Sequence, residues 1–305
     1  MSLRNWIAGV ACAVGALAGS QAMAADTGLM IVGSTALDNP NGSVVLLDLG
    51  SVTRTGDTAT ATILMVMTNS QDGEARGVSH MIGEESLNCK DRMTVTSKIA
   101  AYSEDGIKIG EFDTGDAPKP AASGTPWRRM LDRVCDGPDA EGEAEPFADV
   151  AEAVSFVRGV VAAVQNRTSP MLPHRYVFVG QLTNGEGSRT AAFVDMANLE
   201  HDGDALVRWV VLINTPPVDR GGVTVLYDLT QMSFDCATGR ARIRYAEAIG
   251  ANGSTLFGGI TVTPWMRATG SGTLGDMQMR AGCETGLSGA EGLESLEAAA
   301  EYARR

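Results

Sequence analysis

An internal repeat constrains this chain of 305 residues more than any other feature of its sequence. When the chain is shifted by 147 residues and aligned with itself, ten of the 58 positions from 32 to 89 carry identical residues. Cys89 coincides with Cys236 in this register, and Cys135 coincides with Cys283 after one further residue of offset. The period is too long for a solenoid repeat. The sequence therefore predicts a duplicated domain.

The four cysteines of the two units support this division. An even number of cysteines in an exported chain predicts disulfides, and four cysteines allow three connectivities. Cys89 and Cys135 are 46 residues apart, and Cys236 and Cys283 are 47 apart, so the simplest pairing gives each unit one disulfide. A structural zinc site is the alternative, which the lack of C-x-x-C and the count of three histidines disfavour. We expect no metal and no cofactor.

The first 24 residues have the pattern of a secretory signal peptide. Arg4 precedes an apolar run from Trp6 to Leu17, and Ala22 to Ala24 form an A-x-A cleavage site. The run has 12 residues, too few to cross roughly 30 Å of hydrocarbon. We expect cleavage near Ala24, export, and no transmembrane segment in the mature protein.

Strand patterns followed by a helical pattern occur in each unit. Thr58 to Ile63 alternates polar and apolar residues, and Leu206 to Ile213 is its more apolar counterpart. Residues 136–145 and 166–173 are rich in loop-forming residues. We expect an α+β fold with a first domain at 25–165, a linker at 166–173 and a second domain at 174–305.

A helix closes each unit in this interpretation. Pro146 suits the first helical turn of the first unit, and a stripe of valines follows at spacings of four and three: Val150, Val154, Val157, Val161 and Val164. In the second unit, Ser288 and Glu291 form a capping box ahead of Leu293, Leu296, Ala300 and Ala303. We expect both helices to pack on a sheet. A membrane-surface helix is the alternative, which the acidic face of the second helix disfavours.

The second unit contains a motif built around its two cysteines. Ser233 to Cys236 leads into a basic alternating strand, Arg240 to Tyr245, and Trp265 and Cys283 follow. This motif resembles the surface-adhesin protein E family of small exported bacterial domains. The resemblance covers about 110 residues of this unit. It implies an antiparallel sheet with a C-terminal helix packed on one face and tied by the disulfide. The first unit departs from the motif, since Asn88 stands where an aspartate is expected.

Arg240, Arg242 and Arg244 are the candidate ligand-binding residues. They alternate along one strand of a chain whose formal charge is −13, so they form a local exception. Three guanidinium groups suit an anionic partner, such as a polysaccharide or an acidic protein surface. A solvated strand face paired with acidic neighbours is the alternative. We expect no catalytic residues, because Ser79 and His80 lack the second glycine of a nucleophile elbow.

The charge also bounds the partners, because an excess of acidic residues excludes a general nucleic-acid binder. We expect a non-catalytic, adhesin-like binding protein of the bacterial cell envelope, periplasmic or at the surface, with a protein or polysaccharide ligand. One alternative is an inhibitor of a cationic envelope enzyme such as lysozyme. Another is an enzyme with an inter-domain site. Because duplication can fuse an ancestral symmetric pair, we also expect an intrachain two-fold pseudo-dimer.

Overall fold

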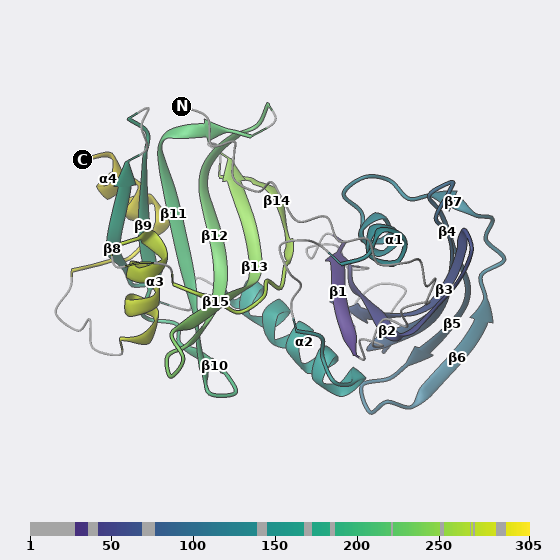
Figure 1. Ribbon diagram of the computed structural model, residues 1–305. Coiled ribbons are helices and arrows are strands. Elements are labelled where there is room, and N and C mark those ends of the chain that lie inside the picture. Colours follow the sequence, from purple (N-terminus) through teal and green to yellow (C-terminus); the bar gives the residue numbers. More distant parts are fainter. Residues whose placement is uncertain are drawn as a thin grey trace, which may run out of the picture.

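Two antiparallel sheets form the scaffold of the protein. The computed structural model describes residues 28–35, 42–68, 77–138, 145–167, 173–183, 187–220, 222–250, 253–268, 270, 272–284 and 291–305. Within these ranges the fold is α+β, with four helices and two disulfides, which confirms the predicted fold class. The predicted signal peptide lies outside the described residues. Figure 1 shows the two sheets next to each other, with helix α2 running between them.

The first sheet follows the order of the chain, β1-β2-β3-β4-β5-β6, and all its pairs are antiparallel. Its strands are β1 (Leu29–Ser34), β2 (Ser43–Thr55), β3 (Thr58–Met67), β4 (His80–Asn88), β5 (Met93–Tyr102), β6 (Lys108–Asp113) and the short β7 (Lys119–Pro120). Side chains alternate between the two faces of a strand, and β2 is apolar on both faces, with Val44 on one and Val45 on the other. The sheet curves around helix α1 (Pro126–Asp136), which covers one face.

The second sheet repeats the strands of the first in the same order and adds the short strands β10 (Glu200–Asp202) and β16 (Gly292–Leu293). Its long strands are β8 (Tyr176–Thr183), β9 (Arg189–Asp195), β11 (Ala205–Asp219), β12 (Thr224–Asp235), β13 (Arg240–Gly250) and β14 (Thr255–Ile260). Three short strands lie at its margins: β10, β15 (Met266–Arg267) and β16. Helix α3 (Leu274–Cys283) corresponds to α1, and α4 (Leu296–Arg304) follows β16. This correspondence supports the predicted duplication.

Each disulfide joins the end of a central strand to a short helix. Cys89 follows β4 and pairs with Cys135 in α1, while Cys236 follows β12 and pairs with Cys283 at the end of α3. Each unit thus carries one disulfide, as the sequence predicts. Helices α1 and α3 themselves are not among the predicted elements, although a threonine N-cap precedes each helix.

The two C-terminal helices begin later than the sequence predicts. Phe147 forms a β-bridge with Leu29, so Pro146 precedes the helix, and α2 (Val150–Arg167) begins three residues after Phe147. In the second unit, Leu293 pairs with Tyr176 across β16 and β8, and α4 begins after its N-cap Ser295. Residues that we assigned to the starts of helices, such as Leu293, therefore pair with strands instead. The predicted capping residue Ser288 lies outside the described residues.

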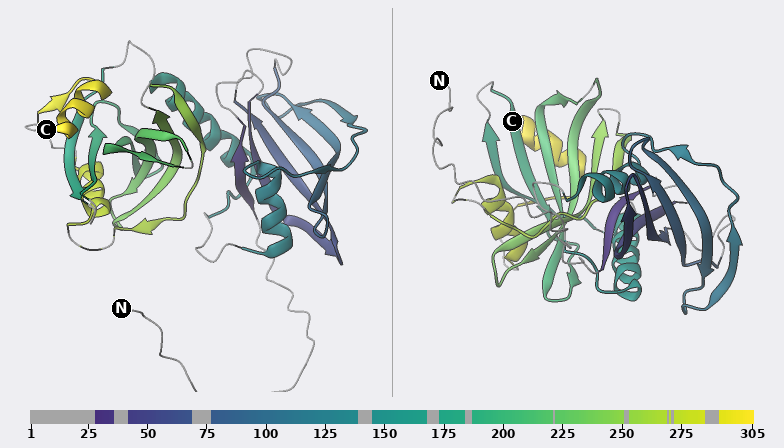
Figure 2. Two further views of the ribbon diagram at one scale, coloured as in Figure 1. Left: turned by 90° about the horizontal axis from the view of Figure 1, so that it is seen from above. Right: turned by 45° about the vertical axis from the view of Figure 1, so that its right-hand side comes forward.

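Helix α2 packs on both sheets instead of on the first alone. One hydrophobic cluster contains Val44 and Leu64 of the first sheet, Val157 and Val160 of α2, and apolar residues of the second sheet such as Trp209. The helix lies between the two units in both views of Figure 2. Because it has a sheet on each side, it buries residues beyond the predicted valine stripe, among them Ala153, Phe156, Val160 and Ala163.

The two units meet head to tail. The Ile260 backbone N–H on β14 donates a hydrogen bond to Ser34 Oγ on β1, over 3.2 Å. This contact joins the last long strand of one sheet to the first strand of the other. A two-fold axis would instead bring corresponding elements together. The arrangement therefore differs from the pseudo-dimer that the duplication suggested.

Candidate functional site

The three arginines on β13 lie among aromatic side chains, and we call Arg240, Arg242 and Arg244 the arginine ladder. The guanidinium carbons of Arg240 and Arg242 are 5.8 and 4.6 Å from the ring centroid of Trp265. Those of Arg242 and Arg244 are 5.5 and 4.6 Å from the ring of Phe156 on α2. A cation above an aromatic face is attracted by the ring quadrupole. The ladder thus contacts the helix that connects the units.

Burial increases along the ladder. The side chain of Arg240 is 37% exposed and that of Arg242 is 14% exposed, while Arg244 is 5% exposed as a whole. Arg240 pairs with Asp235 at 3.4 Å, and Arg242 pairs with Asp202 at 2.7 Å. Burial lowers the pKa of Arg244, and neighbouring Arg242 acts in the same direction. Binding of an anionic ligand here stays a prediction, and Arg240 is the member that solvent reaches most easily.

The opposite end of α2 is held by a buried ion pair. Arg167 pairs with Glu247 of β13, and the Tyr245 hydroxyl donates to the second carboxylate oxygen of Glu247 over 2.8 Å. The Arg167 guanidinium also lies 5.3 Å from the ring centroid of Trp209. The second sheet therefore contacts α2 at Phe156 through the ladder and at Arg167 through Glu247. A pocket of about 420 Å³ lies beside the ladder, lined by residues of both units including Phe147, Asp202 and Arg244.

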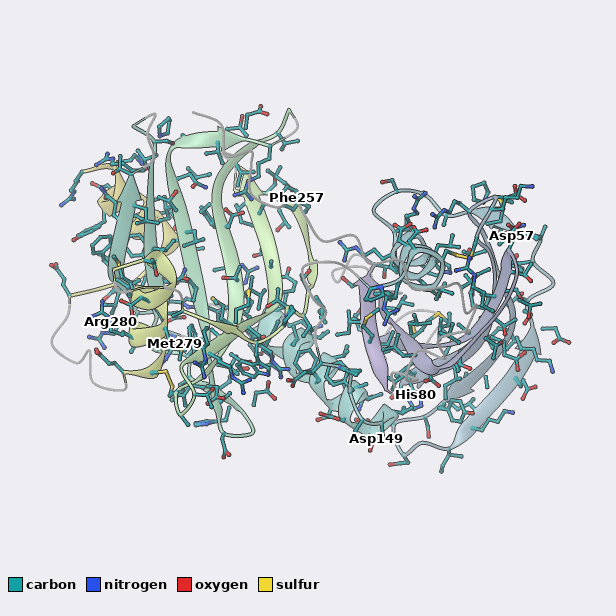
Figure 3. All side chains as sticks on the ribbon, viewed as in Figure 1. Asp57, His80, Asp149, Phe257, Met279 and Arg280 are labelled. Carbon is teal, nitrogen blue, oxygen red and sulfur yellow. A yellow bond between two sulfur atoms is a disulfide. The ribbon has the colours of Figure 1, made fainter. Side chains whose placement is uncertain are left out.

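Ser79 and His80 lie in the interior beside α2. Ser79 Oγ is 3.2 Å from His80 Nδ1 and accepts a hydrogen bond from Arg158 of α2 over 3.0 Å. The His80 ring stacks on Tyr102 with centroids 5.1 Å apart, and Figure 3 shows His80 at the side of the first unit from which α2 emerges. Burial lowers the pKa of His80, and Arg158 adds to this shift. Both residues are buried, so the hydroxyl is not presented to solvent.

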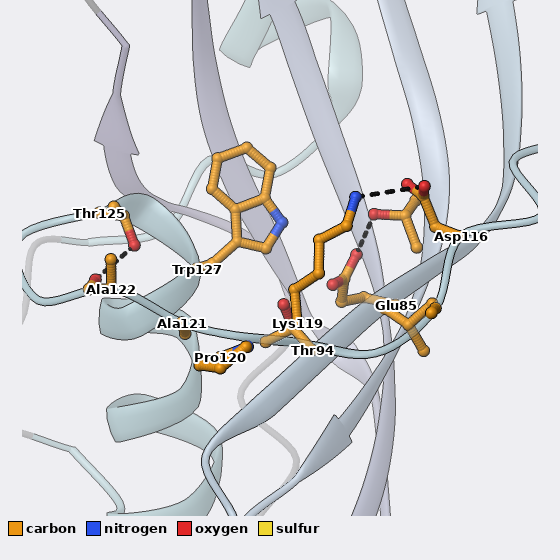
Figure 4. Close-up of a pocket in the computed structure, with 12 residues that line it drawn as sticks. Glu85, Thr94, Asp116, Lys119, Pro120, Ala121, Ala122, Thr125 and Trp127 are labelled. Atoms are coloured by element: carbon orange, nitrogen blue, oxygen red, sulfur yellow. Dashed lines mark hydrogen bonds and ion pairs between the residues drawn. The ribbon is translucent and has the colours of Figure 1, made fainter.

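A different pocket lies within the first unit, between α1 and strands β4, β5 and β7 (Figure 4). It has a volume of about 320 Å³. Its charged side chains are Glu85, Asp116 and Lys119, and its one aromatic side chain is Trp127. We call it the Glu85 pocket, because a buried carboxyl group contributes to its wall.

Glu85 is 1% exposed. Its Oε2 accepts a hydrogen bond from the Thr96 hydroxyl over 2.7 Å, whereas its Oε1 has no hydrogen-bond partner among the described residues. Burial raises the pKa of this carboxyl, and the hydroxyls of Thr96 and Thr94 oppose the shift. An acceptor oxygen without a partner is costly in a buried position. Among the described residues of the first unit, Glu85 is the one buried carboxyl group.

An exposed ion pair lies at the mouth of the pocket. Lys119 on β7 forms an ion pair with Asp116 over 3.2 Å, and both side chains are mostly exposed. In Figure 4 the Lys119 side chain runs between Trp127 and Glu85 toward Asp116. Exposed ion pairs contribute little free energy. The pocket thus has a buried carboxyl group, Glu85, in its wall, and an exposed side chain, Lys119, that can be displaced at low free-energy cost.

The second unit lacks this chemistry. Glu85 pairs across the sheet with Thr96, and Leu87 pairs with Thr94. The corresponding pairs of the second sheet are Met232 with Ile243 and Phe234 with Ala241. Sequence reasoning missed Glu85, although the internal alignment sets this acidic residue opposite Met232. An acidic residue aligned with a methionine at a position that faces the core was the signal in the sequence that could have identified Glu85.

Comparison with known families supports the resemblance. Residues 34–136 match the sequence profile of the Surface-adhesin protein E family. The prediction of an adhesin E-like unit is thus confirmed, but the match lies on the first unit, where we saw the weaker motif, and covers roughly one third of the chain. Among curated proteins, none matches the chain. None of the described helices has the length and apolar character needed to span a membrane.

Proposed function

We propose that this chain is an exported, non-catalytic adhesin of the cell envelope and that strand β6 of its first unit forms the contact surface. The match to an adhesin family over residues 34–136 supports a role in surface binding. Strand β6 lies within this match and at the free end of the first sheet. The proposal depends on its exposure.

Strand β6 presents apolar side chains to solvent. On the strand, Ile109 is 55% exposed and Phe112 50%, and Ile107, directly before the strand, is 65% exposed. Among the described residues, β6 pairs only with β5, so its outer backbone edge is open. Exposed apolar edge strands are templates for pairing with another chain. This strand therefore offers both hydrogen-bonding groups and apolar contacts to a ligand.

An extended protein segment fits such a surface best. Strand addition supplies main-chain hydrogen bonds, and alternate side chains of the added strand meet the apolar residues. The corresponding strand of the second unit, β14, is placed differently, because it contacts β1 of the first unit. Figure 3 shows Phe257 of β14 on the side that faces the first unit. The head-to-tail arrangement thus leaves β6 as the open strand of this type.

Export is the second part of the proposal. The segment 1–24 has the three parts of a signal peptide. Two disulfides suit an oxidising compartment outside the cytosol. We propose cleavage near Ala24 and a location at the cell surface or in the periplasm. Protease treatment of intact cells tests the surface location, since a surface protein is degraded while a periplasmic one is protected.

The contact surface is tested with the double variant Ile109→Asp, Phe112→Asp. We expect it to reduce binding of the purified mature chain to cultured epithelial cells by roughly tenfold or more, since two apolar contacts are lost. Flow cytometry with labelled protein measures this binding. Leu182→Asp is the matched control, because Leu182 is an exposed apolar residue on β8 of the second unit. Equal binding by the β6 variant and the unmodified chain would refute the assignment of this surface.

A further inference from the structure

We propose that the Glu85 pocket binds an alkylammonium group, such as the end of a lysine side chain or a free primary amine. The pocket lies between α1 and the sheet, and its lining residues do not include β6. The proposal is therefore independent of the contact surface assigned above.

The buried carboxyl group provides the first argument. Glu85 Oε1 is a buried acceptor with no donor in hydrogen-bond geometry among the described residues, although the Thr94 hydroxyl lies near enough to lower the pKa of this carboxyl. A primary ammonium carries three N–H donors and a positive charge. It would satisfy this oxygen and also stabilise the ionised form of a carboxyl group that burial disfavours.

The charges of the lining favour a cation over an anion. Two of the lining side chains are acidic, Glu85 and Asp116, and one is basic, Lys119. Trp127 adds an aromatic side chain, and the face of an indole attracts an ammonium group that approaches within about 6 Å. A carboxylate and an indole in one pocket are the two partners that alkylammonium groups use in proteins.

Lys119 shows that such a chain fits. Its alkyl stem lies between Trp127 and Glu85 in Figure 4, and its ammonium group reaches Asp116. The Lys119 side chain is mostly exposed and its ion pair with Asp116 is exposed as well, so displacing it has a low free-energy cost. An incoming ammonium can take the space of this stem and reach Glu85 once Lys119 turns toward solvent.

The second unit indicates that the fold does not need the carboxyl group. Methionine, alanine and isoleucine occupy the positions of Glu85, Thr94 and Thr96 there, at Met232, Ala241 and Ile243. The same sheet and helix therefore form with an apolar lining. A buried carboxyl with one unpartnered oxygen is unfavourable for stability, and binding gives a reason for its presence.

Isothermal titration of the purified mature chain tests the site with two probes, Nα-acetyl-lysine amide and 1,4-diaminobutane. We expect both to bind, and 1-butanol, which is neutral, to bind at least roughly tenfold more weakly because it lacks the charge that pairs with Glu85. Glu85→Gln should weaken binding of both amines by roughly tenfold. Lys119→Ala should strengthen it, since the competing stem is removed.

Glu200→Gln is the matched control, because Glu200 is a second carboxyl whose pKa is raised by burial, in the other unit. It should change the affinity by less than about twofold. If Glu85→Gln does not fold, Glu85→Met replaces it, since methionine occupies the corresponding position 232. Circular dichroism checks the fold of each variant.

The affinity should also increase as the pH rises through the pKa of Glu85, because only the carboxylate pairs with the ammonium. Glu85→Gln should remove this dependence. Tighter binding of the lysine amide would point to a lysine of a partner protein, and tighter binding of the diamine to a free amine. Equal affinities for butanol and the amines, or unchanged amine binding in Glu85→Gln, would overturn the proposal.

Discussion

The two units share one scaffold but carry their polar groups on opposite faces. In the first unit, the face toward α1 holds Glu85, Thr94 and Thr96, where the second unit has apolar residues. On the other face, the second unit holds the arginine ladder, where the register places Met93, Val95 and Ser97 in the first. The strand order and the disulfides are the same in both.

This difference shows how a duplicated domain separates two tasks. In the second unit, the charged face holds α2 through the ladder and Glu247, so it joins the units. The first unit contributes an open edge strand and a polar pocket, which suit a ligand. We infer that the first unit binds the ligand and that the second unit holds the first unit in position through α2.

The largest expected effect on stability comes from removing a disulfide, and comparing the two disulfides tests whether the two units depend on them equally. Replacing Cys89 and Cys135 by serine should lower the free energy of unfolding by about 4 kcal/mol, from the loop entropy alone. Replacing Cys236 and Cys283 should lower it by a similar amount, because the closed loops have 46 and 47 residues of separation. Urea unfolding of both variants measures this. A difference of more than about 2 kcal/mol would show that one unit depends far more on its disulfide than loop entropy predicts.

The next largest effect on stability comes from removing an aromatic ring from α2, and comparing it with α4 tests the different roles of the two helices. Phe156→Ala should cost about 3 kcal/mol, since the buried ring of α2 contacts Phe147 of the first unit and Arg244 of the second. Tyr302 on α4 contacts aromatic residues of the second sheet only and is 41% exposed. Tyr302→Ala should therefore cost only about 1 kcal/mol. Equal losses in thermal or urea unfolding would contradict the view that α2 joins the units.

Much of the scaffold could be predicted because its signals are local or repeated. The repeat aligned Cys89 with Cys236, and this alignment led to the duplication and to one disulfide in each unit. Alternation in Thr58 to Ile63 predicted a strand, and β3 contains it. The valine stripe predicted α2, of which Val157 and Val161 are buried.

The remaining features depend on contacts between distant residues. The sequence pattern of α2 predicts one apolar face, and it does not predict that another face of the helix contacts Trp209 and Arg244 of the second unit. The arginine ladder alternates as an exposed strand would, and the sequence pattern does not show that Phe156 of α2 packs on the buried Arg244. In the sequence Glu85 resembles an exposed strand residue, and its burial depends on α1, a distant helix that we did not predict and that covers this face of the sheet.

The smallest effect compares an ion pair from each unit. Arg242 is mostly buried, and its partner Asp202 also accepts a hydrogen bond from Ser233 over 3.3 Å. Asp202→Asn should therefore cost about 1 kcal/mol, because it leaves a buried guanidinium without its counter-charge. In the first unit, Asp116→Asn should change stability by less than about 0.5 kcal/mol, since its pair with Lys119 is exposed.

Urea unfolding at low and high salt separates these two cases. Salt screens exposed pairs much more than buried ones, so the effect of Asp202→Asn should persist at high salt while that of Asp116→Asn disappears. Equal, salt-sensitive losses would mean that the ladder behaves as a solvated surface. In that case Arg240, Arg242 and Arg244 would all be open to a ligand, and the division of tasks between the units would no longer hold.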